Sequence, residues 1–265
     1  MSLVDYHCHT RYSGDGRGEI RDLCVRAVEL GITQIAITEH VDTDPTDPCY
    51  DFYDHEAVGA AIGRCREEFG ASVAVRHGIE IDYQKRLHDE AVEFMATHEF
   101  DVVLGSAHYI RGKRGWENEV YELNDERSAY MGHFEGTLAA AESGLFDVMC
   151  HLDLVKRYGI PHYGPYDRAP YAAIIDEILR VMADKGQALE VNTSGLRQTP
   201  QATFPEIETV RRYRELGGQL VTLGSDCHKP ADLGAGLAEG ADIIRRAGFT
   251  RLTVFEGRER AFVDL

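Results

Sequence analysis

The feature that most constrains the fold is a regular alternation of short apolar segments with longer segments of helical periodicity. Short, continuously apolar strands are typical of a parallel sheet, and amphipathic helices would cover such a sheet from outside. We expect strands at residues 3–6, 34–38, 73–75, 101–106, 146–149, 188–192, 220–225 and 252–255, and helices at 19–30, 55–69, 87–97, 125–143, 171–184, 206–216 and 233–247.

Seven or eight such strand–helix units predict an α/β fold that closes into a barrel of the TIM type. Single barrels commonly reach a length of 265 residues, so we expect one domain over residues 1–265. A doubly wound open sheet is the weaker alternative, because side chains from six strands would then have to span a wide, flat edge. Residues 42–54, 110–124 and 157–169 are expected to form loops over the rim.

Histidine and carboxylate side chains come at, or just after, the ends of the predicted strands. Because the carboxyl ends of parallel strands meet at one rim of a barrel, these side chains are expected to lie together. Imidazole and carboxylate are ligands for zinc, manganese and iron, and nine of them are too many for one ion. The pattern therefore indicates a multinuclear metallohydrolase. The nine candidate ligands are His7, His9, Asp15, His40, Glu80, His108, His151, Asp226 and His228.

The spacing of the first and last candidates strengthens this interpretation. His7 and His9 are two residues apart, so both side chains project from the same face of a strand. Asp226 and His228 repeat that spacing at the last ligand-bearing strand. Other catalytic motifs are excluded: the glycines at 14–18 lack the spacing of a dinucleotide-binding loop, and the chain contains neither HExxH nor GxSxG.

Most of the remaining histidines and the six cysteines are interpreted as structural. Cys8, Cys150 and Cys227 adjoin candidate ligands, and strand alternation predicts that they point outward against the helices. Metal binding by these cysteines is the less favoured alternative. His77 and His162 are the two further histidines that could reach the rim, although solvation or local hydrogen bonding is the favoured interpretation.

Charge and hydropathy exclude several classes of partner. A net charge of −17 argues against long nucleic acid, whose binding rests largely on lysine and arginine that neutralise phosphates. A small phosphate ester remains compatible, because bound cations would offset part of that charge. No apolar segment approaches the roughly 18–20 residues of a membrane span, and no charged-then-apolar leader precedes the first strand. We therefore expect a cytoplasmic enzyme with no membrane partner, and the oligomeric state stays open.

These motifs together resemble the PHP (polymerase and histidinol phosphatase) superfamily. The resemblance covers essentially the whole chain, and within the family the stand-alone phosphatases are most similar through residues 101–110, 144–158 and 192–197. It implies a distorted (β/α)₇ barrel, which agrees with the predicted order of strands and helices. The motifs that carry it are the HxH pair at 7–9, Thr38-Glu39-His40, Gly78-Ile79-Glu80, Ser106-Ala107-His108, His151-Leu152-Asp153 and the segment 224–228.

The resemblance also implies three divalent metal ions, with zinc, iron and manganese as the possible identities. Many relatives carry histidine where this chain has Asp15, and a carboxylate at that position favours harder ions. The implied ligand sets are His7, His9, Glu80 and Asp226 for one ion, a bridging Glu80 with His108 and His151 for a second, and Asp15, His40 and His228 for the third.

The reaction that the resemblance implies is hydrolysis of L-histidinol phosphate to L-histidinol and phosphate, a step of histidine biosynthesis. A hydroxide shared between two ions would attack phosphorus in line, so we expect neither a protein nucleophile nor a phosphoenzyme. Arg197 and Arg157 are the candidate phosphate-binding residues, because arginine offers paired, planar donors. The alternatives are action on another small phosphate ester, a nuclease module beside a polymerase, and metal binding without catalysis.

Substrate selection is less evident from the sequence. Histidinol phosphate carries a cationic amine and an imidazole, so acidic and aromatic side chains in the rim loops would suit it. Asp153 is a candidate for orienting a ligand histidine through a hydrogen bond. The loop candidates for substrate contact are Asp42, Trp116, Glu117 and Tyr121, each of which packing or solvation would also explain.

Overall fold

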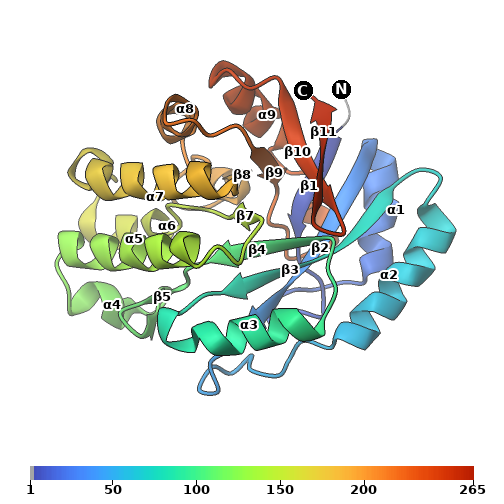
Figure 1. Cartoon of the computed structure of the whole chain (residues 1–265), viewed down its shortest axis with the longest axis horizontal. Coiled ribbons are helices and arrows are strands. Elements are labelled where there is room, and N and C mark those ends of the chain that lie inside the picture. The colour runs from blue at the N-terminus through green and yellow to red at the C-terminus, as the bar shows by residue number, and fades with distance from the viewer. Residues whose placement is uncertain (1–2) are drawn as a thin grey trace.

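A computed structural model describes residues 3–265, and its centre is a sheet of seven parallel strands (Figure 1). The two outer strands of the sheet meet each other: the backbone N–H of His9 donates to the carbonyl of Cys227 (2.8 Å), and that of Asp226 donates to the carbonyl of His7 (2.9 Å). This contact makes the sheet a nearly closed barrel, which confirms the predicted (β/α)₇ fold and shows that the open-sheet alternative is wrong. The strands, in spatial order, are β1 (Leu3–Cys8), β2 (Ile32–Asp42), β3 (Ala74–Asp82), β4 (Val102–Ser106), β7 (Val148–Met149), β8 (Ala188–Asn192) and β9 (Val221–Gly224).

Helices cover the outside of the barrel, close to the predicted ranges (Figure 1). The first of them shows how the sequence sets its limits: the Asp22 carboxylate accepts from the backbone N–H of Glu19 at the start (3.0 Å), and Gly31 ends it in the left-handed conformation (φ 70°). The outer helices are α1 (Ile20–Leu30), α2 (His55–Phe69), α3 (His88–Thr97), α5 (Glu126–Ser143), α7 (Ala172–Lys185), α8 (Ile207–Glu215) and α9 (Leu237–Arg246). Single 3₁₀ turns lie at Lys85–Leu87, Ala169–Tyr171, Ser194–Arg197 and Pro230–Asp232.

Two of the three predicted rim loops contain regular structure, so those predictions are wrong in part. Segment 110–124 includes strand residues and helix α4 (Asn118–Glu122), and the short strands β5 (Tyr109–Ile110) and β6 (Lys113–Arg114) form a hairpin. Segment 157–169 begins inside helix α6 (Val155–Tyr163). The helical pattern of α6 is concealed by Pro161 and by Gly159, which packs directly against the ring of Tyr130 where a larger side chain would overlap it.

The end of the chain adds a hairpin rather than a single strand. The predicted strand at 252–255 lies within β10 (Arg251–Glu256), which pairs antiparallel with β11 (Glu259–Asp264). Gly257 and Arg258 form the turn with φ angles of 55° and 63°, the left-handed values typical of a two-residue hairpin loop. Most of β11 is exposed, so it lacks the buried apolar pattern by which the other strands were predicted. Within residues 3–265, no helix combines the length and the apolar character that crossing a bilayer requires.

Candidate metal centre

All nine predicted ligands gather at the carboxyl-terminal rim of the barrel. His7 lies in β1, His40 in β2 and Glu80 in β3, whereas the others follow the ends of strands or lie in the loop after β1. Glu80 is at the centre of the group: its carboxylate lies 2.8 Å from Nε2 of His151 and 3.1 Å from both Nε2 of His7 and Nδ1 of His40. Nε2 of His108 is 3.5 Å away. One buried carboxylate thus contacts histidines from four strands or strand ends, as the barrel topology predicts.

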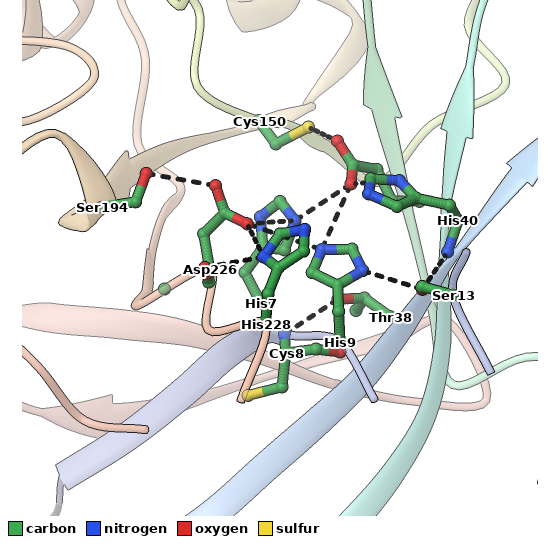
Figure 2. A network of polar contacts seen from close by, with 12 residues as sticks. His7, Cys8, His9, Ser13, Thr38, His40, Cys150, Ser194, Asp226 and His228 are labelled. Atoms are coloured by element: carbon green, nitrogen blue, oxygen red, sulfur yellow. Dashed lines mark hydrogen bonds and ion pairs between the residues drawn. The ribbon is translucent and has the colours of Figure 1, made fainter. Parts of the chain in front are cut away.

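Two further carboxylates extend the group along the rim, and Figure 2 shows one of them, Asp226, beside His228. Oδ1 of Asp226 lies 3.4 Å from Nδ1 of His228 and 3.6 Å from Nε2 of His9. Asp15 lies 3.2 Å from Nε2 of His228 and 3.7 Å from Nε2 of His40. The nine side chains therefore form one continuous set in which carboxylates and imidazoles alternate, large enough for more than one cation.

Two of the candidate ligands have unusual backbone conformations. His151 and Asp226 have φ angles of 25° and 51°, in a left-handed region that non-glycine residues rarely adopt. Each turns the chain sharply at the end of a strand, so the side chain faces inward over the rim. Strain of this kind persists only where surrounding contacts enforce it and is concentrated at functional sites.

The charges of the cluster favour cations. Burial alone would lower the pKa of His7, but surrounding carboxylates, with Glu190 the largest influence, raise it well above its ordinary value. Burial would raise the pKa of Glu80, yet the neighbouring histidines hold it well below its usual range. Burial lowers the pKa of His108 to about 3 and that of His9 well below its ordinary value. The ionised carboxylates and the neutral imidazoles of His9 and His108 are in the protonation states that metal ligation requires, whereas a metal ion would have to replace the proton that the carboxylates favour on His7.

His9 gives the clearest structural sign that the residues fit metal ions. Its side chain is fully buried, and Nδ1 contacts the Ser13 hydroxyl at 3.2 Å. Nε2 makes no hydrogen bond within residues 3–265, although it faces Glu80 at 3.4 Å and Asp226 at 3.6 Å. A buried ring nitrogen without a hydrogen bond is costly, and one that points between two carboxylates is suited to a cation. The donor set fits the predicted divalent metals.

Cys150 departs from its predicted orientation. Its Sγ lies 3.2 Å from Oε1 of Glu80, on the metal-ligand side of the strand rather than outside it (Figure 2). Strand alternation does not hold here because β7 ends at Met149 and the chain turns at His151. Cys8 and Cys227 pack in the hydrophobic core, as expected.

The two further histidines considered for the rim have other partners. Nε2 of His77 contacts the Tyr53 hydroxyl at 2.8 Å, and its ring stacks on that of His55. The ring of His162 stacks on that of Tyr121. Local contacts of this kind agree with the favoured interpretation of both histidines.

A cavity of about 820 Å³ opens directly above the cluster. Arg197 and Arg157, the two predicted phosphate-binding residues, both line it. Nη2 of Arg197 donates to the carbonyls of Ser225 (2.7 Å) and Asp226 (3.1 Å), which fixes the guanidinium beside the ligand loop. Basic residues that the sequence analysis did not select, Arg114 and Lys229, also line the cavity.

The residues considered for substrate contact separate into two groups. Asp42 and Trp116 line the cavity, and Trp116 is half exposed there. Tyr121 is instead buried, with its hydroxyl donating to the carbonyl of Gly115 (2.6 Å). Glu117 pairs with Arg114 (2.7 Å), so its carboxylate stabilises the loop rather than facing the cavity.

A different carboxylate fills the role that was considered for Asp153. Asp153 pairs with the buried Lys156 (2.9 Å) and contacts none of the nine candidates through its side chain. Glu190 in β8 lies 2.7 Å from Nδ1 of His7 and orients that ring. Nothing local in the sequence indicates this, because Glu190 is the single charged residue of β8 and its partner is 183 residues away.

Comparison with known proteins places this geometry in a family. A family model described as PHP domain matches residues 5–194. The chain belongs to the PHP domain family. This PHP protein is 31% identical over 261 residues to a probable histidinol-phosphatase of Deinococcus radiodurans, with 95% of this chain and 96% of the relative covered. It is 28% identical over 260 residues to the histidinol-phosphatase of Lactococcus lactis, with 97% and 96% covered.

Solved structures of PHP proteins agree with the barrel. The crystal structure of histidinol phosphate phosphatase from Lactococcus lactis, complexed with Zn, L-histidinol and phosphate, has a TM-score of 0.91 at 27% sequence identity and covers 98% of this chain and 99% of that chain. The putative histidinol phosphatase from Listeria monocytogenes has a TM-score of 0.77 at 20% identity, covers 89% of this chain and 99% of that chain, and supports the fold alone.

Proposed function

We propose that this PHP protein is a metal-dependent phosphatase that hydrolyses L-histidinol phosphate to L-histidinol and phosphate, a step of histidine biosynthesis. One observation carries the proposal: nine histidine and carboxylate side chains of the kind that bind metal lie together beneath a cavity that arginines also line. Full-length relatives named histidinol-phosphatase support the choice of substrate, as does the similarity to a protein solved with L-histidinol and phosphate.

The donor sets divide among three proposed divalent ions, zinc, iron or manganese. Bound there, the ions would lower the pKa of an attacking water and offset the negative charge of the phosphoryl oxygens. The proposed ligands are His7, His9, Glu80 and Asp226 for the first ion, Glu80, His108 and His151 for the second, and Asp15, His40 and His228 for the third.

The arginines provide the anion-binding side of the cavity. Because both hydrogens of Nη2 in Arg197 are directed at backbone carbonyls and its Nε lies 3.8 Å from Oδ2 of Asp232, the two N–H groups of Nη1 are the ones proposed to bind phosphoryl oxygens. Arg157, whose guanidinium lies over the ring of Tyr158 (4.9 Å), is proposed as the second phosphate ligand. Paired guanidinium donors match the geometry of phosphate better than a lysine would.

Acidic residues also line the cavity, which suits a cationic leaving group. Asp42 and Asp47 both line it, and burial raises the pKa of Asp42 to about 6, so the Asp42 carboxylate is charged at neutral pH. We propose that Asp42 attracts the amine of histidinol while the arginines hold the phosphate. A small zwitterionic ester would therefore bind in one orientation.

Water is the proposed acceptor of the phosphoryl group. Ring nitrogens of His7, His40 and His151 contact Glu80 within 3.1 Å, which engages them as proposed ligands rather than as nucleophiles. The residues of the chain are thus assigned to binding and orientation, and no phosphorylated side chain is proposed.

A panel of phosphate esters tests the proposal. We expect kcat/KM for L-histidinol phosphate to exceed that for glycerol phosphate, which has no amine, by at least 100-fold, and Asp42→Asn to reduce this ratio about tenfold. Glu177→Gln, an exposed carboxylate on α7, is the matched control and should leave the ratio unchanged. Equal turnover of both esters would support a phosphatase but contradict L-histidinol phosphate as its specific substrate. No turnover of any ester would contradict the proposed function as a whole.

A further inference from the structure

Strand β8 supplies none of the nine proposed ligands, yet its buried polar side chains contact three of them. Glu190 and Asn192 lie on β8, and Ser194 lies two residues beyond the end of that strand. All three side chains are buried. We propose that these three residues form a positioning network that holds His7, His151 and Asp226 in the orientation needed for metal binding. This inference rests on the metal centre of the proposed function but not on the identity of the substrate.

Glu190 holds two ligand-bearing segments at once. Oε1 lies 2.7 Å from Nδ1 of His7, and Oε2 accepts from the backbone N–H of His151 (2.8 Å). With Nδ1 of His7 engaged by this carboxylate, Nε2 is turned toward Glu80 (3.1 Å), the centre of the cluster. A carboxylate that accepts from the second nitrogen of a ligand histidine fixes both its tautomer and its ring orientation.

Asn192 and Ser194 hold one oxygen of Asp226 and leave the other for metal. Nδ2 of Asn192 lies 3.2 Å from Oδ2 of Asp226, and the Ser194 hydroxyl lies 3.1 Å from the same oxygen (Figure 2). Oδ1 of Asp226 instead faces His9 at 3.6 Å. Nδ2 of Asn192 also donates to Oε2 of Glu190 (3.1 Å), so the contacts to His7, His151 and Asp226 belong to one connected network.

Gly224 in β9 provides the space in which this network forms. A Cβ at position 224 would lie 2.5 Å from Oε1 of Glu190 and 2.5 Å from Cβ of His7, closer than such atoms approach each other. The absence of a side chain at this residue is therefore required by the Glu190–His7 contact. Gly224→Ala should disturb the same contact from a neighbouring strand without changing any polar group.

Metal affinity measured without substrate tests the network. Competition with a chelator against zinc and against manganese should show that Glu190→Gln binds metal 10–100-fold more weakly than the wild type. Glu177→Gln replaces an exposed carboxylate on α7 and should bind as the wild type does. Ser194→Ala removes the hydroxyl that contacts both Oδ1 of Asn192 (2.7 Å) and Oδ2 of Asp226 (3.1 Å), and should weaken binding by about threefold. Gly224→Ala should weaken binding as Glu190→Gln does.

The melting temperature of the metal-free proteins separates positioning from folding. We expect metal-free Ser194→Ala and Glu190→Gln to melt close to the wild type while their metal affinity falls. Metal affinity of a folded Glu190→Gln protein within twofold of the wild type would overturn the inference. If Glu190→Gln does not fold, an unchanged affinity of Ser194→Ala overturns it and a threefold loss supports it. These outcomes do not depend on turnover of L-histidinol phosphate, so failure of the substrate assignment would leave them intact.

Discussion

Arg197 offers the most quantitative test of the anion-binding side of the cavity. Its guanidinium is already fixed by two backbone carbonyls, and its side chain is 26% exposed. Because it is partly solvated, we take the low end of the range for charged hydrogen bonds, about 1.5 kcal/mol for each of two contacts with the phosphoryl group. Arg197→Ala should then raise the barrier by about 3 kcal/mol, which corresponds to roughly a 100-fold loss of kcat/KM.

The assay is steady-state phosphate release from L-histidinol phosphate, with metal supplied in excess. Arg197→Lys keeps the charge but replaces the guanidinium that two backbone carbonyls hold in place with a single ammonium group, so it should recover only part of the loss. Arg180→Ala removes an exposed arginine on α7 that pairs with Asp176, and it serves as the control. A loss smaller than threefold for Arg197→Ala would refute the assignment of Arg197 to phosphate binding.

The other predictions concern stability and stereochemistry. Lys156→Met should lower the free energy of unfolding by about 3–5 kcal/mol in urea titrations, because it leaves Asp153 as a buried charge without its partner. Adding Asp153→Asn should restore much of the lost stability, and no recovery in the double variant would contradict this reasoning. Burial lowers the pKa of His133 to about 4, so between pH 6.5 and 4 the imidazole of His133 binds a proton in the unfolded chain but not in the folded one. The free energy of unfolding should therefore fall by about 2 kcal/mol from pH 7 to pH 5, and His133→Gln should reduce this loss. A free energy of unfolding that depends on pH equally in His133→Gln and in the wild type would contradict this assignment to His133. Hydrolysis of a chiral phosphate ester should invert configuration at phosphorus, and retention would indicate a phosphorylated side chain.

Much of the fold and the candidate centre could be predicted because, in a barrel of parallel strands, the carboxyl end of every strand lies at the same rim. Each selected histidine or carboxylate lies at the carboxyl-terminal rim, at or after a strand end, so residues as distant as His7 and Asp226 meet without any long-range information. The apolar strands and the glycine-terminated helix α1 carry equally local signals.

The features that the sequence concealed depend on tertiary contacts. Glu190 is the single charged residue of β8, and only the closure of the barrel brings it to His7. Cys150 faces Glu80 because the chain leaves the strand geometry at His151, which alternation along a strand cannot indicate. Helix α6 contains Pro161, and its stability comes from packing rather than from helical propensity.

The most direct test of the account is phosphate release from L-histidinol phosphate before chelation, after chelation, and after zinc or manganese is restored. The account predicts turnover that is lost when a chelator removes the metals and that returns when metal is added back. Turnover that persists in metal-free protein would contradict the proposed metal centre.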